Sequence, residues 1–227
     1  MGNLAEQIEI QPILLKPPLS VEEFIKKYGD LEDMMTYELI DGYVYMSFAP
    51  ARVHQRLAVF LTSKIGGFLE GKTCQLYVAP FNVFLSPPLS ENEKDGKQEN
   101  KKNKSGKIRE MYKKGTVVQP DLFVVCETGK LRDDGCHGAP DFIIEIASPT
   151  TGDSDFMRKF FKYLESGVKE YWIVNPDEDI KKIMVFKFNP ETKKPEKFEI
   201  FTFSDKIKIS VLDELEIDFS QFNFYLG

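Results

Sequence analysis

The sequence predicts a protein of the mixed α/β (α+β) class, in which a central sheet is flanked by helices. Two near-continuous apolar runs, at residues 116–126 and 139–148, are typical of central strands that are buried on both faces. Predicted elements follow one another in the order helix, strands, helix, strand. The 227 residues are enough for one large domain. We therefore expect a single domain over residues 19–227, preceded by a tail at residues 1–18.

Three segments have the capping or the spacing of helices. In LSVEEFIKKYGD, residues 19–30, Ser20 is the expected N-cap and Glu23 follows three residues later, which makes a capping box. Residues 50–67 carry an apolar face at helical spacing. Residues 152–167, GDSDFMRKFFKYLESG, form a second amphipathic segment that ends in glycine.

The other apolar segments are predicted strands. In YELIDGYVYMS, residues 37–47, two short runs are joined by Asp41-Gly42, a strong signal for a tight hairpin. Residues 74–86 are predicted to form a strand that is interrupted at Pro80. Residues 169–176 resemble another buried strand, and the apolar runs after it predict an added C-terminal β meander at 181–188, 197–203 and 211–220.

A polar, lysine-rich insertion occupies residues 87–114 and contains almost no aliphatic side chain. We expect it to be a mobile loop between two strands. Its lysines could contact phosphates, and the alternative is a solvated segment without a ligand.

Composition and charge favour a soluble protein of the cytoplasm. The net charge of −6 and the pI of about 5.2 do not indicate a nucleic-acid-binding protein by themselves. Three cysteines cannot all pair, no secretory signal precedes them, and no apolar run reaches the length of a transmembrane helix. We therefore expect reduced cysteines and no membrane partner. Zinc binding at Cys136-His137 is not expected, because no second Cys/His pair has ligand spacing.

Two acids stand inside or directly before the predicted buried strands. Glu145 lies within the apolar run 142–146, and Asp121 precedes the run 122–125. Burying an ionised carboxylate is costly unless it is paired or binds a metal. Two carboxylates at one height on adjacent strands can bind a single Mg²⁺, which prefers oxygen ligands. Asp141 is about 13 Å from Glu145 along an extended strand, too far to share that ion. The alternative is that Glu145 pairs with a buried Arg or Lys and that Asp121 only starts a strand.

Four blocks of the sequence, YELIDGYVYM, VVQPDLFVVC, GCHGAPDFIIEIASPT and KFFKYLESGVKEYWIVNP, resemble the Uma-two family of restriction-endonuclease-like proteins. This family belongs to the PD-(D/E)XK nuclease superfamily, and the similarity runs from about Ser20 to Pro176. The resemblance implies a restriction-endonuclease-like mixed sheet and a metal-dependent endonuclease site that hydrolyses phosphodiester bonds. The expected substrate is nucleic acid, in particular DNA, and the expected cofactor is Mg²⁺, with Mn²⁺ as a substitute.

The resemblance also assigns site residues. Asp121 matches the acid of the first half-motif, and Glu145 matches the acid of the second. Ala147 occupies the position of the usual lysine, whereas Lys159 on the following helix matches a lysine of the Uma-two pattern. The two acids and the main-chain carbonyl of Ile146 are expected to hold the metal. Lys159 would orient the attacking water or stabilise the charge on the phosphate.

Glu38 matches the early acid of the family and is expected to support the metal, although it could instead face solvent in the hairpin. Lys159 could equally be an ordinary surface lysine, and Arg158 and Lys162 are rival candidates for the amine. Substrate contacts are expected from a second group, whose alternative is a polar first turn of a helix: Arg52, His54, Gln55 and Arg56.

A second hypothesis is a catalytically silent member of the fold that acts in nucleic-acid binding or protein assembly. Ala147 and the acidic net charge favour it. A homodimer is also expected as an option, because superfamily nucleases often pair to cut both strands. A glycosidase with paired carboxylates fits the sequence worse, because no aromatic platform for a sugar is evident.

Overall fold

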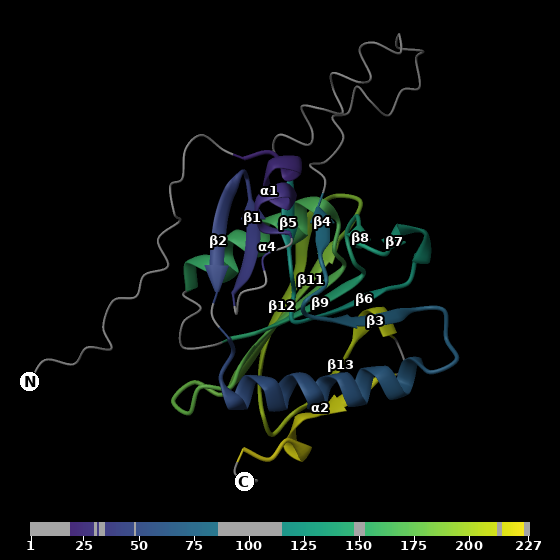
Figure 1. Cartoon of the computed structure of the whole chain (residues 1–227). Helices are drawn as coiled ribbons and strands as arrows, with labels where there is room; N and C mark the ends of the chain where they lie inside the picture. The colour runs from purple at the N-terminus through teal and green to yellow at the C-terminus, as the bar shows by residue number, and fades with distance from the viewer. Residues whose placement is uncertain are drawn as a thin grey trace, which may run out of the picture.

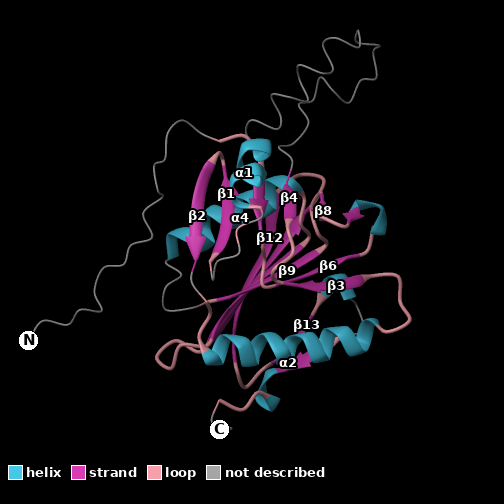
Figure 2. Cartoon of the chain, viewed as in Figure 1, coloured by secondary structure: helices cyan, strands magenta, loops and turns pink. Residues whose placement is uncertain are grey.

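The computed structural model describes residues 19–29, 31, 35–47, 49–85, 115–147, 153–212 and 215–224. The N-terminal tail and the polar insertion at 87–114, for which the sequence led to predictions, lie outside these residues. The described part of the chain forms two six-stranded sheets and one two-stranded sheet (Figure 1). Helices lie on the outer sides of this arrangement (Figure 2).

The first six-stranded sheet, called the main sheet below, has the strand order β12-β11-β10-β9-β6-β3. Strands β9 and β10 are parallel, and all other neighbours are antiparallel. This mixed sheet confirms the predicted fold class. Its strands are β3 (Gln75–Val78), β6 (Leu122–Val125), β9 (Phe142–Ile146), β10 (Glu170–Asn175), β11 (Lys182–Asn189) and β12 (Lys194–Thr202).

The second sheet has the order β2-β1-β5-β4-β8-β7. Between β1 and β2 the chain turns at Asp41 (φ 52°) and Gly42 (φ 84°), the left-handed pair that a tight hairpin requires, so the predicted hairpin is confirmed. The strands are β1 (Thr36–Ile40), β2 (Tyr43–Ser47), β4 (Val83–Leu85), β5 (Thr116–Val118), β7 (Leu131–Arg132) and β8 (Gly135–His137).

The chain passes between the two sheets at two neighbouring points. One passage joins β3 to β4 through the cis Ala79-Pro80 peptide, as the predicted interruption at Pro80 required. The other joins β5 to β6 through residues 119–121. The Ala79 N–H donates to the main-chain carbonyl of Asp121 over 3.1 Å, which holds the two passages together. Asp121 therefore stands at the junction of the sheets.

In the described part of the chain, three α-helices pack on these layers: α1 (Val21–Tyr28), α2 (Arg52–Leu69) and α4 (Asp153–Ser166). The predicted capping box of α1 is present, with Ser20 and Glu23 each accepting from the other's main-chain N–H. Helix α2 buries its apolar stripe against one face of the main sheet. On the opposite face, the side chains of α4 and of the second sheet share one core with the main sheet. The junction of the sheets is thus covered by helices from two sides.

The C-terminal strands do not form the single meander that was predicted, because they belong to two different sheets. Strands β11 and β12 form a hairpin that extends the main sheet, whereas β13 (Lys206–Lys208) and β14 (Glu216–Asp218) form their own small sheet. Glu170, fully buried in β10, holds this last segment: its carboxylate accepts from Trp172 Nε1 at 2.7 Å and from the Ser210 N–H at 2.7 Å. Burial raises the pKa of Glu170. Short 3-10 turns occupy Thr128–Lys130, Ser210–Leu212 and Phe219–Gln221.

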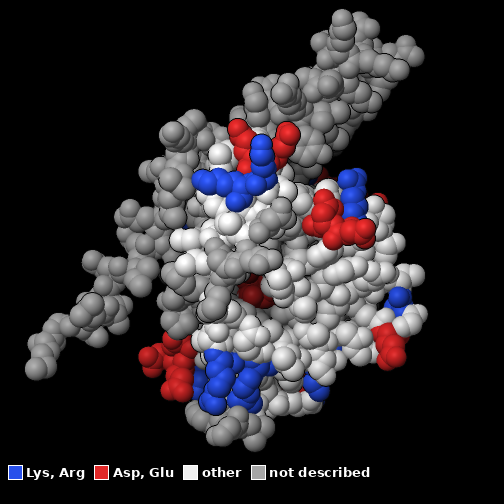
Figure 3. All heavy atoms as spheres, viewed as in Figure 1, with Lys and Arg blue, Asp and Glu red and all other residues white. Residues whose placement is uncertain are grey.

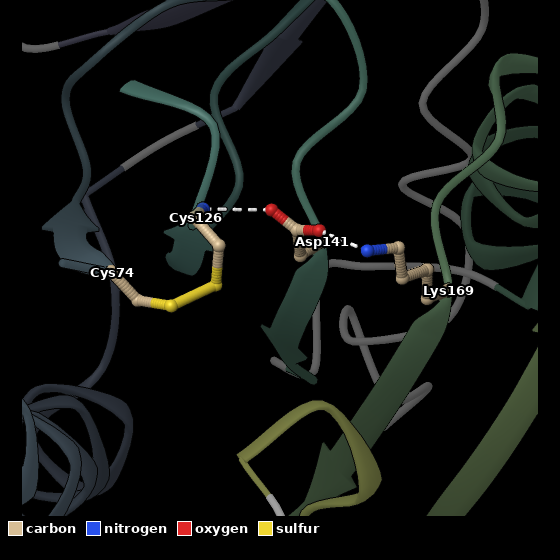
Figure 4. The surroundings of a disulfide bond; sticks show 4 residues. All are labelled: Cys74, Cys126, Asp141 and Lys169. Carbon is tan, nitrogen blue, oxygen red and sulfur yellow. Dashed lines mark hydrogen bonds and ion pairs between the residues drawn. A yellow bond between two sulfur atoms is a disulfide. The ribbon is translucent and has the colours of Figure 1, made fainter.

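A disulfide joins Cys74 to Cys126, which contradicts the expectation of reduced cysteines (Figure 4). The antiparallel register pairs Gln75 with Val125, so the residues one step further out face each other across the two strands. Beside the bond, the Cys126 N–H donates to Asp141 Oδ2 at 2.7 Å. The other oxygen of Asp141 accepts from Lys169 Nζ at 2.6 Å, so this acid orders the start of β9.

Cys136 is a buried free cysteine, and burial raises the pKa of its thiol to about 11. Within the described residues, no helix is long and apolar enough to cross a membrane.

Candidate active site

Asp121 and Glu145 lie side by side on adjacent strands. The antiparallel register of β6 and β9 pairs Leu122 with Ile144, so the next positions, 121 and 145, face each other across the strands. Because side chains alternate along a strand, both point to the face that packs against α4, like Phe123 and Ile143. The Ile146 N–H donates to Asp121 Oδ2 over 2.7 Å, which locks the end of β9 to this acid.

Lys159 reaches this pair from the first half of α4. Its ammonium lies 3.2 Å from Glu145 Oε1 and 2.9 Å from Glu38 Oε2, and its side chain is only 7% exposed. The two rival cations point elsewhere. Lys162 binds Asp41 at 2.7 Å, and the Arg158 guanidinium lies 4.5 Å from the centre of the Tyr45 ring.

Glu38 in β1 connects the acids to the second sheet. Its Oε2 contacts Lys159, and its Oε1 accepts from the Gln119 N–H over 2.8 Å. Its side chain is 12% exposed, so it does not face open solvent as a plain hairpin residue would. Gln119 belongs to the passage between the sheets, and this hydrogen bond fixes that passage next to the lysine. The structure therefore gathers Glu38, Glu145 and Lys159 from three elements.

Tyr163 completes the cluster, and the sequence had not singled it out. Its hydroxyl donates to Glu145 Oε1 over 2.6 Å, and its ring is fully buried against Tyr171. A signal existed: Tyr163 lies one turn after Lys159 on the buried arc of an amphipathic helix, and a buried tyrosine needs a partner for its hydroxyl. Burial, together with the nearby Glu145 carboxylate, raises the pKa of Tyr163.

Burial has a strong effect on Glu145. Desolvation raises the pKa of its carboxyl to about 8, and the ammonium of Lys159 opposes that shift. The carboxylates of Asp121 and Glu38 add to the rise because they repel a further negative charge. The site therefore favours a cation beside Glu145, since a positive charge there would stabilise the ionised form.

The residues predicted to bind substrate separate into two groups. His54 and Gln55 line the cavity over the acids, and His54 Nε2 lies 3.1 Å from Asp121 Oδ2. Arg56 instead binds the main-chain carbonyls of Asn223 and Phe224 and lies over the Phe222 ring, so it secures the C-terminal segment. Arg52 is exposed and does not line the cavity. Thus, of the predicted group, the structure brings only His54 and Gln55 to the site.

A cavity of about 660 Å³ opens above this cluster. Its floor contains Glu38, Asp121, Glu145 and Lys159, and its walls come from β2, from α2 and from the passage after β3. In the space-filling view, acidic atoms are visible at the bottom of a hollow that has uncharged side chains beside it (Figure 3). The acids are thus accessible to a ligand from one side.

Residues 21–220 match the model of the Uma2 family, described as "Putative restriction endonuclease". The chain belongs to the Uma2 family. A search of curated proteins found no match. Among solved structures, this Uma2 chain is similar to a "putative nuclease belonging to DUF820" from Anabaena variabilis, with a TM-score of 0.62. The identity is 17%, over 89% of this chain and 96% of that one, which establishes a shared fold.

A divalent cation such as Mg²⁺ would need oxygen donors from this Uma2 site. Among the described residues, no three His, Cys, Asp or Glu side chains are grouped so that they could hold a metal. Asp121 contacts the Ile146 N–H and His54 through Oδ2, and Glu145 contacts Lys159 and Tyr163 through Oε1. The other oxygen of each carboxylate accepts no hydrogen bond from a described residue. Mg²⁺ often binds one or two carboxylates and takes its other ligands from water and substrate phosphate. The donor set fits such an ion.

Proposed function

We propose that this protein is a divalent-metal-dependent endonuclease that hydrolyses phosphodiester bonds, with DNA as substrate and Mg²⁺ or Mn²⁺ as cofactor. The observation that carries the proposal is the juxtaposition of Asp121 and Glu145 across β6 and β9, with the Lys159 ammonium 3.2 Å from Glu145. A buried acid and amine beside a half-buried second acid, all lining an accessible cavity, are hard to explain as a stabilising device, because such ion pairs contribute little net stability.

Asp121 Oδ1 and Glu145 Oε2, the carboxylate oxygens that accept no hydrogen bond from a described residue, would hold the ion together with the Ile146 carbonyl. In a strand the N–H and C=O of one residue point to the same side, and the Ile146 N–H points to Asp121, so its carbonyl is directed toward the same acid. A bound divalent cation would polarise the phosphate and make a bound water more acidic.

The remaining residues would position the reactants. Lys159 would orient the attacking water or stabilise the charge that builds up on the phosphate oxygens. Water would give one proton to solvent and form a new bond to phosphorus, the bond from phosphorus to the leaving sugar oxygen would break, and that oxygen would take a proton from solvent. Glu38 contacts the Lys159 ammonium in addition to Glu145, and His54 contacts Asp121. These contacts keep the acids and the amine in a fixed arrangement.

The test compares wild-type protein with the Glu145→Ala variant on labelled DNA, with Mg²⁺, with Mn²⁺ and with chelator. We expect the variant to lose about 100-fold or more of the metal-dependent cleavage, while circular dichroism shows an intact fold. Glu165→Gln, an exposed acid on α4, is the control and should cleave normally. Full cleavage by purified Glu145→Ala would remove the proposal.

A silent module of the same fold is the second candidate. It is favoured by Ala147 at the usual lysine position and by the Lys159 ammonium, which contacts two acids. Calorimetric titration with Mn²⁺ separates the two functions. The nuclease requires binding that weakens at least about 10-fold in Asp121→Asn. Binding that ignores this substitution, or no binding at all, would favour the silent module.

We also propose that the protein forms a homodimer and is located in the cytoplasm. A dimer would allow two sites to cut both strands, and light scattering of the purified protein tests it. The Cys74–Cys126 bond argues against the cytoplasm, where thiols are kept reduced. Mass spectrometry after alkylation of freshly lysed cells would decide whether that bond exists in the cell.

A further inference from the structure

The cavity has an uncharged outer part, which we call the outer chamber. It is lined by Gln55, Val59 and Thr62 of α2 and by residues 78–80 at the end of β3. Val59 and Val78 are 68% and 43% exposed, so two large aliphatic side chains line the chamber without being covered by the described part of the protein. Exposed apolar walls beside a polar site are typical of a surface that binds a ligand.

The described residues that line the cavity carry little positive charge. Among the described residues that line the cavity, Lys159 is the sole Lys or Arg, and its ammonium already contacts Glu38 and Glu145. Double-stranded DNA carries about one negative charge per 1.7 Å of its axis, and proteins that hold a duplex contact its phosphates mainly through Lys and Arg. The walls of this chamber are therefore unsuited to the two backbones of a duplex.

The chamber has the chemistry of a site for a nucleobase. A base has two apolar faces, which methyl groups such as those of Val59 and Val78 can cover, and polar edges that amides and hydroxyls can bind. Gln55 and Thr62 offer such groups on the α2 wall. The whole cavity, of which the chamber is a part, has a volume of about 660 Å³ and lies within the usual range of pockets that enclose a small ligand, about 300–1,000 Å³.

We propose that the outer chamber takes an unpaired nucleobase, so that the substrates are nucleic acids with a single-stranded or unstacked nucleotide beside the cleaved bond. The inference rests on the proposed nuclease function. A fully paired duplex would first have to release a base from its stack, which slows the reaction. A single strand, or a duplex with a short unpaired bubble, needs no such step.

The first experiment uses one labelled DNA sequence as a single strand, as a duplex with a central unpaired bubble and as a full duplex. With Mn²⁺, we expect the single strand and the bubble to be cleaved at least about 10-fold faster than the full duplex. Equal or faster cleavage of the full duplex would overturn the inference. Fluorescence anisotropy with Ca²⁺ in place of Mn²⁺ measures binding without cleavage. There, tighter binding of the single strand supports the inference and equal or tighter binding of the duplex overturns it, even if nothing is cleaved and the nuclease proposal fails.

The second experiment removes the apolar walls with the double variant Val59→Ser/Val78→Ser. Both side chains are exposed, so the fold should tolerate the change. We expect its affinity for the single strand to fall at least about 5-fold, while Mn²⁺ affinity and the melting temperature stay the same. Ile180→Ser is the matched control, because Ile180 is 45% exposed and does not line the cavity. Unchanged single-strand affinity in the double variant would contradict a base-binding chamber.

Discussion

The Cys74–Cys126 bond should be a major source of stability. The two cysteines are separated by 52 residues, and the loop that they close contains β3 to β6 and therefore Asp121. In the chain-entropy model, closing a loop of this length stabilises the folded state by about 4 kcal/mol. For a chain of this size, 1 kcal/mol corresponds to about 2–4 °C of melting temperature. Removing the bond should therefore lower the melting temperature by about 8–16 °C.

The perturbation is the double variant Cys74→Ala/Cys126→Ala, measured by thermal and urea unfolding next to wild type with and without dithiothreitol. Both cysteines are only partly buried at the edge of the α2-side core, so alanine at these positions should leave a small packing defect. Reductant should destabilise the wild type and leave the double variant unchanged. A loss below about 1 kcal/mol in the double variant, or an equal effect of reductant on both proteins, would refute the loop-closure reasoning.

Four further predictions concern the cluster and its surroundings. Tyr163→Phe keeps the packed ring but removes the 2.6 Å hydrogen bond to Glu145. The Mn²⁺ affinity measured by calorimetry should therefore fall about 10-fold. An unchanged affinity would contradict a positioning role for Tyr163. Because the pKa of Glu145 is about 8 in the fold and 4.5 without it, the folded state keeps a proton that the unfolded chain loses. In chelator, the free energy of unfolding should therefore decrease as pH rises from about 4.5 to 8, and Glu145→Gln should flatten that slope; equal slopes would exclude this carboxyl as the source. Lys159→Met leaves buried carboxylates without their counter-charge and should lower the free energy of unfolding in urea by about 3–5 kcal/mol. Adding Glu145→Gln to this variant should reduce the loss. A loss below about 1 kcal/mol would mean that solvent already screens the ion pair. Arg56→Ala should lower the free energy of unfolding by about 1–2 kcal/mol, because it removes the hydrogen bonds to the main-chain carbonyls of the C-terminal segment. DNA affinity should not change. Weaker DNA binding by this variant would restore Arg56 as a phosphate contact.

Features that depend on a few neighbouring residues could be predicted from the sequence. The capping box at Ser20 and Glu23 and the tight turn at Asp41-Gly42 each involve a local hydrogen-bond or backbone requirement, and the structure contains both. The proximity of Asp121 and Glu145 was also predictable, because one acid directly precedes an apolar strand, the other lies inside the next apolar strand, and neighbouring strands can bring two such positions to one height.

Features that depend on register between distant segments could not be predicted in this way. The pairing of Cys74 with Cys126 follows from the alignment of β3 with β6, which no local pattern encodes. The two contacts of Arg56 depend on where the last residues of the chain pack. Gln119 acts through its main-chain N–H, a group that every residue except proline has, so its side chain gave no signal.

The junction around the polar insertion has a practical consequence. Strands β4 and β5 pair directly, with Leu85 opposite Thr116, so the chain leaves and re-enters the fold at adjacent points. Neither residue lines the cavity. A targeting domain could therefore be inserted between them. Such an insertion should leave the alignment of both sheets intact, so the protein could be tethered to a chosen sequence through this edge.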